Sequence, residues 1–543
     1  CTAGYLSRLA AHHPEVFATH THLVIDEIHE RSVDTDLLCY MAKRLLEMHS
    51  RLKLVIMSAT INTKTYSDYF GIPEDEYLFV GARRFPLTVN WLDEFGTIGT
   101  KKKKKGKTGS AGGDNSPICA PLPSIMVRQA DKILGSVRSP MEAVQSKVSD
   151  LQIDLAFDLA RFVGRPGRTV LIFVAGMRDI EEFADRFNDI NRRRPRQRYV
   201  VIPIHSDIPF DDQMSAFDAV DPDAERAPVK VVVATNSAES SITLPDCDHV
   251  ICMGTAKRVE YNARRHRVQL VHRWISKAGV EQRAGRTARV RPGTVWRLYG
   301  KEFFQSMDEF DPPELQQTPL EHVILQLRSA LSTHVVPVLQ NVISPPDLRA
   351  LEPAFNELHR MGFIYGPDDD SELTEDGQVA AALGIDLKIA QFVILGVRLG
   401  IPKESAAVAA ALSVDRSPFR TASPFVHTPR EMADIVRTVA RGMEFFSRGM
   451  GSSPMMLARV LLWYRSLQGK NGGKAFRWRK NQLSQHGLVS GRLKRFDTLA
   501  RGIERKLSRF VHGLDEVVLR DLAEHPRVRI LLRLALLWSF SDQ

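Results

Sequence analysis

The stretch Thr21-His22-Leu23-Val24-Ile25-Asp26-Glu27 decides how the N-terminal part of the chain is interpreted. Its β-branched and apolar residues are typical of a short buried strand, and two acidic residues follow directly. A second run of the same kind, residues 52–57, comes after a helical pattern at residues 34–48. A strand, a helix and a second strand in this order predict a β-α-β unit and therefore a parallel sheet.

Strand-like runs return further along the chain, separated by helical stretches such as residues 179–188. They lie at residues 169–174, 199–204, 230–234 and 249–252. This alternation predicts a second α/β domain. Beyond about residue 311 strands nearly vanish and amphipathic helical patterns dominate, at residues 321–331, 347–361, 388–399, 404–412 and 455–466.

Composition places the chain among ordinary globular proteins. Its 543 residues allow three or four domains at roughly 100–200 residues each. The apolar fraction is 43%, and no apolar run reaches the ~18 residues that cross a bilayer. A net charge of +10 favours polyanionic partners. The five cysteines form no CxxC pair, which argues against a disulfide framework and a zinc site and predicts a reducing compartment.

Residues 96–145 interrupt the α/β pattern. Their first part is rich in Gly, Ser and Pro and contains five consecutive lysines at residues 101–105. Such a composition buries too little apolar surface to order itself. We therefore predict a low-complexity, disordered insertion.

Asp26 and Glu27 are the first candidates for chemistry. They follow a strand, and carboxylates at the carboxyl ends of parallel strands can reach a ligand beyond the sheet. One acid can hold Mg²⁺ through water while its neighbour polarises an attacking water. The alternative is that the pair only caps the next helix.

A second candidate is the segment Gln282-Arg283-Ala284-Gly285-Arg286-Thr287-Ala288-Arg289. Its arginines recur every third residue, so we predict that they lie close to one helix face. Arginine suits a phosphoryl group that gains charge. The alternative is a basic surface helix without a ligand.

Together with Ser58-Ala59-Thr60 and Thr235-Asn236-Ser237-Ala238-Glu239-Ser240-Ser241, these motifs resemble in order those of the DEAH-box family of superfamily 2 RNA helicases. The resemblance implies ATP-dependent movement along RNA in the 3'-to-5' direction and remodelling of RNA or RNA–protein complexes. ATP and Mg²⁺ would be the cofactors. RNA would be the partner, gripped by its backbone with little sequence preference, adaptor proteins could join it, and no membrane is involved. A helicase-fold scaffold that binds RNA without turnover is the alternative.

The resemblance also implies roles for individual residues. Asp26 would coordinate Mg²⁺ with Glu27 beside it, and Glu27 would activate the attacking water. Catalytic roles would extend to His29, Ser58, Thr60, Gln282, Arg286 and Arg289. Nucleotide contacts would come from Asp26, Glu27, Phe217, Gly285, Arg286 and Arg289. The residues implied to contact RNA are Thr2, Gly4, Thr235, Asn236, Ser241, Arg264, Arg265 and Arg267, the last three in a hairpin at residues 259–274.

The family's architecture implies an α/β fold with two RecA-like parallel-sheet domains, the first incomplete, followed by a winged-helix domain and a helical ratchet domain. The predicted boundaries are 1–85 for the C-terminal part of RecA-like domain 1, 96–145 for the insertion, 150–310 for RecA-like domain 2, 311–378 for the winged-helix domain, 379–512 for the HA2-like ratchet and 513–543 for the start of a truncated C-terminal region.

Two departures from the family pattern stand out. The phosphate-binding loop should precede Thr2, so we expect a fragment that lacks this P-loop and hydrolyses almost no ATP by itself. Gly106-Lys107-Thr108 imitates such a loop but follows the acids and has no flanking strand and helix, so we reject it. Ala288 stands where the family usually has glycine.

Overall fold

The computed structural model describes residues 1–59, 63–73, 77–79, 81, 85–98, 121–194, 198–208, 213–218, 227–239, 244–262, 267–331, 334–423, 425, 427–468 and 473–541. The chain divides into two compact units. Unit 1 comprises residues 1–23, 32–55 and 318–543, and unit 2 comprises residues 24–31 and 56–317. Among the described residues, no helix combines the length and the apolar character that a membrane span needs.

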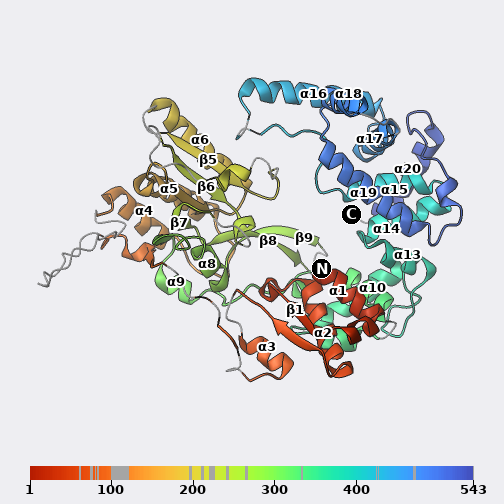
Figure 1. Ribbon diagram of the computed structural model, residues 1–543, viewed down its shortest axis with the longest axis horizontal. Helices are drawn as coiled ribbons and strands as arrows, with labels where there is room; N and C mark the ends of the chain where they lie inside the picture. Colours follow the sequence, from red (N-terminus) through yellow and green to blue (C-terminus); the bar gives the residue numbers. More distant parts are fainter. Residues whose placement is uncertain are drawn as a thin grey trace, which may run out of the picture. The chain divides into compact units, whose positions relative to one another are not determined.

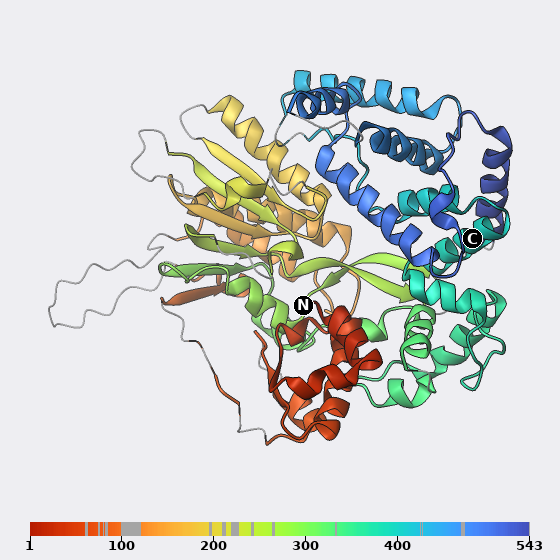
Figure 2. The same cartoon turned by 45° about the vertical axis from the view of Figure 1, so that its right-hand side comes forward.

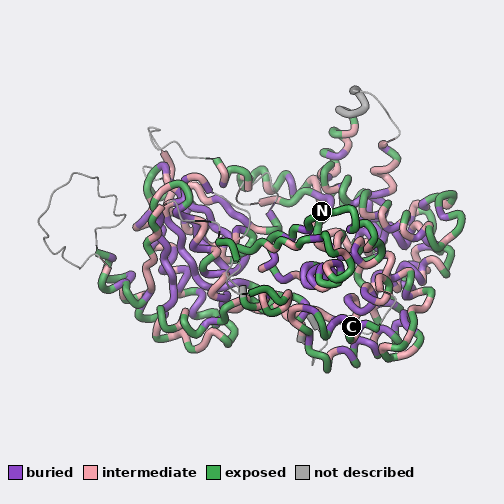
Figure 3. The backbone as a smooth tube through the Cα atoms, turned by 60° about the horizontal axis from the view of Figure 1, so that its bottom comes forward, coloured by how far each residue is buried: buried purple, intermediate pink, exposed green. Residues whose placement is uncertain are grey.

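Unit 2 is built around a six-stranded sheet whose neighbouring strands all run parallel, in the order β3-β10-β7-β4-β6-β5 (Figure 1). Its strands are β3 Leu87–Trp91, β4 Thr169–Phe173, β5 Tyr199–Ile204, β6 Val229–Ala234, β7 Cys247–Cys252 and β10 Gly293–Arg297. Every residue of β4, β6 and β10 is buried, and Figure 3 shows the sheet as a block of buried chain. Strands covered on both faces are mainly apolar, and the buried Lys230 of β6 is compensated by an ion pair with Asp246 at 3.1 Å.

The helices of unit 2 pack on this sheet. They are α4 Ser124–Leu134, α5 Ser146–Val163, α6 Met177–Arg193, α8 Lys277–Ala284 and α9 Lys301–Gln305. Helix α5 contacts β4 and β7, α6 contacts β5 and β6, and α8 contacts β7. In α6 the buried residues Ile180, Phe183, Ala184 and Phe187 form one stripe, and the ring of Phe187 lies 4.8 Å from that of Tyr199. The second predicted α/β domain is therefore confirmed.

Part of the range predicted as a disordered insertion is ordered. Residues Ser124–Leu134 form helix α4, which buries Met126, Ala130 and Ile133. The side chain of Gln129 also donates to Asp158 of α5 at 3.1 Å. Our prediction of disorder over 96–145 was wrong for this stretch. It applied the composition of the neighbouring lysine-rich residues to a segment whose apolar residues are spaced i, i+4, i+7, as in a helix with one buried face. The lysine run itself lies outside the described residues.

The N-terminal β-α-β unit forms as predicted. Its strands are β1 His22–Ile25 and β2 Lys53–Ile56, joined by helix α2 Val33–Met48, with α1 Ala3–His12 before and α3 Thr63–Phe70 after. The backbone amide of Lys53 donates to Thr21 and that of Met57 donates to Ile25, both at 2.8 Å. The residue numbers of donor and acceptor rise together, so the two strands run parallel. Both strands contribute residues to each of the two units.

A two-stranded antiparallel hairpin, β8 Thr255–Asn262 with β9 Arg267–Trp274, extends from unit 2 away from the parallel sheet (Figure 2). The sequence predicted such a hairpin within residues 259–274, and its first strand begins four residues earlier. Across the strands, Arg273 and Glu260 form an ion pair with 2.7 Å between Nε and Oε1. On the hairpin, Val259 lies opposite Leu270, and both are exposed.

From residue 318 onward the described chain is helical apart from the isolated bridges Ile364↔Leu373 and Phe419↔Leu488. The helices are α10 Leu320–Leu331, α11 Val335–Gln340, α12 Leu351–Arg360, α13 Glu375–Leu383, α14 Leu387–Arg398, α15 Pro402–Ser413, α16 Pro429–Ser447, α17 Ser453–Gln468, α18 Gly473–Gln485, α19 Ser490–Leu507 and α20 Pro526–Phe540. Helices α14 and α15 pack closely, since a Cβ on Gly396 would lie 2.4 Å from the side chain of Ser405. The predicted helical C-terminal third is confirmed.

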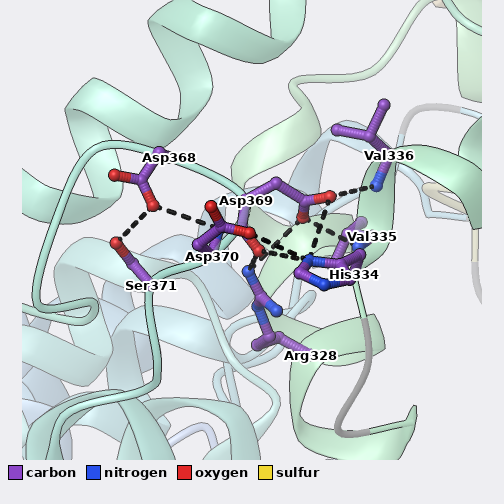
Figure 4. A network of polar contacts seen from close by, with 8 residues as sticks. All are labelled: Arg328, His334, Val335, Val336, Asp368, Asp369, Asp370 and Ser371. Atoms are coloured by element: carbon purple, nitrogen blue, oxygen red, sulfur yellow. Dashed lines mark hydrogen bonds and ion pairs between the residues drawn. The ribbon is translucent and has the colours of Figure 1, made fainter.

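An acidic loop within this helical part is held against the start of α11 (Figure 4). Asp369 accepts hydrogen bonds from the amides of Val335 at 2.8 Å and Val336 at 3.1 Å, and its carboxylate lies 3.4 Å from Arg328. A carboxylate at these free amides stabilises the helix terminus. The loop is thereby fixed to the helix without any ligand.

Candidate functional site

Asp26 and Glu27, with the following Ile28 and His29, form what we call the acid segment. The amide of Ile28 donates to Met57 at 3.2 Å, so the pairing of β1 with β2 continues past the strands to the acids. Asp26 Oδ1 accepts from the amide of Glu27 at 2.8 Å, and both carboxylates are exposed. Glu27 has a left-handed backbone with φ of 52°. Such a conformation in a residue with a side chain is strained and concentrates at functional sites.

His29 connects the acid segment to residues 58–59. Its Nδ1 accepts from the amide of Ala59 at 3.3 Å and lies 3.4 Å from Glu27 Oε2. A neutral ring with its proton on Nε2 satisfies the Ala59 bond. The ring is only 10% exposed, whereas Ser58 is exposed. Of the predicted group Ser58-Ala59-Thr60, Thr60 lies outside the described residues.

Residues 282–289, which we call the arginine segment, do not form one helix face. Helix α8 ends at Ala284, with Gly285 as its C-cap. Arg283 is fully buried, whereas Arg289 is exposed and its Nε donates to the carbonyl of Gly285 at 2.9 Å. Our prediction that Arg283 lies beside Arg286 and Arg289 on a helix was therefore wrong. The regular spacing continued past the residue at which the helix ends.

Arg286 is half-buried, and its surroundings show which groups gather at the site. Burial lowers the pKa of Arg286 to about 10, and the charge of Arg289 lowers it further. The carboxylates of Glu239 and Glu27 act in the opposite direction. The guanidinium stays charged at neutral pH. Within unit 2, Glu27 of the acid segment and Arg286 of the arginine segment therefore lie within electrostatic reach of each other.

Ala288 occupies a tight turn in the arginine segment. It is buried and has a left-handed backbone with φ of 59°. The neighbouring hydroxyl of Thr287 donates to the carbonyl of Cys247 at 2.8 Å, which fixes the turn on β7. Glycine adopts this backbone without strain. The fold thus gives a physical reason for the glycine expected at position 288.

Comparison with known proteins agrees with this geometry. The family model described as the helicase conserved C-terminal domain matches residues 154–291, from α5 through the arginine segment. The chain is 30% identical over 433 residues to the DExH-box ATP-dependent RNA helicase DExH1 of Arabidopsis thaliana, which covers 77% of this chain and 42% of that relative. The chain belongs to the DEAH-box family of superfamily 2 RNA helicases.

Other relatives of this DEAH-box chain carry similar names. DExH-box ATP-dependent RNA helicase DExH3 of Arabidopsis thaliana is 29% identical over 90% of this chain and 40% of its own length. ATP-dependent RNA helicase DHX29 of Homo sapiens is 29% identical over 78% of this chain and 32% of its own length. The chain thus spans less than half the length of these relatives. The family resemblance inferred from the sequence motifs is confirmed.

The residues implied to contact RNA in a DEAH-box protein have structural partners where they are described. In the turn after β6, Thr235 is buried, its amide donates to Ile204 at 3.2 Å and its hydroxyl lies 3.3 Å from that of Ser237. Asn236, beside it, is exposed. Ser241, Arg264 and Arg265 lie outside the described residues, and Arg267 is described only as backbone in β9.

Thr2 and Gly4 serve helix α1. The Thr2 hydroxyl accepts from the amide of Tyr5 at 3.4 Å and caps the helix. A Cβ on Gly4 would lie 2.3 Å from Asp34 Oδ2, so this glycine permits the close approach of α1 and α2. Both residues therefore have a packing role that is independent of RNA.

The remaining candidates for nucleotide contact are placed as follows. Phe217, directly after the 3₁₀ turn Met214–Ala216, is half-buried. Gln282 is half-buried on α8. Among the described residues no cluster of three or more His, Cys, Asp or Glu side chains could hold a metal alone. One or two carboxylates are enough for Mg²⁺ that is also bound by phosphates and water, and the exposed Asp26 fits that requirement.

Proposed function

We propose that this chain forms part of a motor that hydrolyses ATP and moves along RNA in the 3'-to-5' direction, remodelling RNA or RNA–protein complexes. The observation that carries the proposal is that the acid and arginine segments lie in one unit, where the charge of Glu27 raises the pKa of Arg286 against the effect of burial. An acid that can activate water and an arginine that can neutralise a phosphoryl group are the two protein parts that phosphoryl transfer needs most. The names of the DExH-box relatives support the choice of ATP and RNA.

The chemistry would divide between the acid and arginine segments. Glu27 orients the attacking water and takes its proton, while Asp26 holds Mg²⁺ through water. When bound, Mg²⁺ neutralises charge on the phosphate oxygens. Gln282, Arg286 and Arg289 stabilise the charge that develops on the γ-phosphoryl group. His29 accepts from the amide of Ala59 and lies beside Glu27, so it links residues 58–59 to the segment that carries the catalytic acid.

RNA would be held mainly by its backbone. Thr2, Gly4, Asn236 and Ser241 would contact phosphates, and the arginines of the β8–β9 hairpin add charge. The buried Thr235, whose amide donates to Ile204, would act by shaping the turn that carries Asn236. Contacts of this kind read no base edges, so sequence preference is weak. Selection of RNA then depends on its shape, on single strands and on adaptor proteins.

The second candidate function is an RNA-binding scaffold without turnover. The observation that favours it is the strained, left-handed Ala288 beside the arginines. A scaffold would bind RNA with the same affinity in the presence and absence of nucleotide. A motor would change its RNA affinity with the nucleotide state, because part of its RNA contacts, those after β6 and on the β8–β9 hairpin, belong to the same unit as its arginines.

The test is ATP hydrolysis by the full-length protein with and without single-stranded RNA. We expect RNA to stimulate turnover, and Glu27→Gln to abolish it while the binding of nucleotide persists. Glu30→Gln makes the same chemical change three residues away, at an exposed carboxylate, and should behave like wild type. Equal turnover in wild type and Glu27→Gln would sink the catalytic assignment.

The same assay applies to residues 1–543 alone. These residues contain no Gly-x-Gly-Lys-Thr loop between a strand and a helix, which would bind the β- and γ-phosphates. We therefore expect almost no hydrolysis from this piece. Turnover near that of the full-length protein would contradict the expectation.

A further inference from the structure

Arg283 has no role in the proposed chemistry, yet it is one of the largest fully buried side chains in the described part of the molecule. Its side chain is 0% exposed. Transferring a guanidinium out of water costs several kcal/mol unless ion pairing and hydrogen bonds compensate. The partners of Arg283 therefore tell which parts of the fold depend on it.

The first partner is Glu239, whose Oε1 lies 2.6 Å from Arg283 Nε. Glu239 ends the 3₁₀ turn Asn236–Ala238 that follows β6. This turn begins with Thr235, one of the residues implied to contact RNA. Residues 235–239, which we call the turn segment, are therefore tied by a part-buried ion pair to the arginine segment 44 residues away in sequence.

The second partner is the base of the β8–β9 hairpin. Arg283 Nη1 donates to the carbonyl of Thr255, the first residue of β8, at 3.1 Å. The guanidinium also lies over the ring of Phe173 at the end of β4, 4.9 Å from the ring centre. A guanidinium is planar with its donors in fixed directions. It cannot follow the turn segment or the hairpin independently without breaking one of these bonds.

The same carboxylate also acts on Arg286. Glu239 stabilises the charged form of Arg286 against the effect of burial on its pKa. A phosphoryl group approaching Arg286 would compete with Glu239 for the guanidinium. The carboxylate thus acts on two arginines, through an ion pair with the buried Arg283 and through its charge on Arg286.

We propose that the Arg283–Glu239 pair is a positioning device that transmits RNA contact at the turn segment and the hairpin to the phosphate-facing arginines. The inference rests on the proposed function and deepens it. Neither residue touches the reacting atoms. Loss of the pair should uncouple RNA from hydrolysis while leaving the hydrolytic groups in place.

The experiment measures ATP turnover of the full-length protein as a function of RNA concentration for Glu239→Gln. Because Glu239→Gln leaves the buried guanidinium of Arg283 without its charged partner, turnover is measured at a temperature at which the variant is still folded. There we expect turnover without RNA to stay within about twofold of wild type and stimulation by saturating RNA to fall at least tenfold. The matched control is Glu281→Gln. Glu281 pairs at 2.6 Å with another buried arginine, Arg297, which is 3% exposed and lies over the ring of Trp91 at the end of β3.

A second variant separates loss of coupling from loss of folding. Glu239→Asp keeps the negative charge that Arg283 needs but shortens the side chain, so it should remain folded and still lose stimulation. Retained stimulation in both Glu239 variants would overturn the inference. Equal losses with and without RNA would also overturn it, because they indicate a purely structural pair.

The outcome is separable from the proposed function. Stimulation of wild type that Glu27→Gln abolishes would support the motor whatever the Glu239 variants do. Absence of RNA-stimulated turnover in wild type would remove the proposed function, and the inference with it. Stimulation that is lost in Glu239→Gln and kept in Glu281→Gln supports both.

Discussion

The acid segment and the arginine segment are both suited to act on phosphate, yet the fold holds them in opposite ways. Asp26 and Glu27 are exposed and are fixed by short bonds to neighbouring residues. The arginine segment is built on a buried cation, Arg283, whose partners come from distant parts of the chain. The acids can therefore be changed at little cost to folding, whereas the arginines cannot all be changed without cost.

The largest difference in stability should appear between variants of Arg283 and variants of Arg289. Arg283→Met leaves Glu239 without its buried partner and should destabilise unit 2 by about 3–5 kcal/mol. Arg289→Ala removes an exposed side chain and should change stability by less than ~0.5 kcal/mol. Native-state hydrogen exchange of amides in β6 and β7 measures this locally. Similar protection in the two variants would break the comparison.

The acid segment could be predicted from the sequence, whereas the surroundings of the arginine segment could not. The acid segment is local: a β-rich run followed by Asp26-Glu27 specifies the strand and the edge of the sheet. The arginine segment depends on partners remote in sequence. An i, i+3, i+6 pattern cannot show that Arg283 is buried, because the signal is a carboxylate at Glu239 and a carbonyl at Thr255. Glycine at position 285 was the one local sign that the helix ends there.

The fold as a whole was predictable to a similar degree. Apolar, β-rich runs such as β4 and β6, alternating with helical patterns, specified an α/β domain. Helix α4 was missed because the composition of its neighbours outweighed its own apolar spacing. The left-handed conformations of Glu27 and Ala288 could not be read from residue type, since neither residue favours them. Such strain comes from tertiary packing.

The second prediction concerns these two left-handed residues. Ala288→Gly should stabilise unit 2 by about 0.5–1 kcal/mol, because glycine adopts a φ of 59° without strain. RNA-stimulated turnover should be equal to wild type or higher. Glu27→Gly relieves the same kind of strain but removes the catalytic acid, so it should abolish turnover. Destabilisation by Ala288→Gly would show that the alanine methyl group packs usefully.

The smallest expected effect lies beneath the arginine segment, at neighbouring residues of β7. Burial lowers the pKa of His249 from 6.5 to about 4. Its contribution to stability is therefore complete above pH 6.5 and is lost as the pH falls towards 4. Burial raises the pKa of Asp248 from 3.8 to about 6, against the influence of Arg168. That contribution is complete below pH 4 and is lost as the pH rises through 6.

The contributions of His249 and Asp248 change with pH in opposite directions over the same range. The stability of wild-type unit 2 should therefore change little between pH 4 and 6. Asp248→Asn removes the contribution that decreases as the pH rises, so the free energy of unfolding should then increase with pH over this range. His249→Gln removes the contribution that increases as the pH rises, so the free energy of unfolding should then decrease with pH over the same range. Hydrogen exchange of β7 amides, corrected for intrinsic rates at each pH, gives the slopes. Slopes of the same sign in the two variants would mean that the groups do not titrate as opposed neighbours.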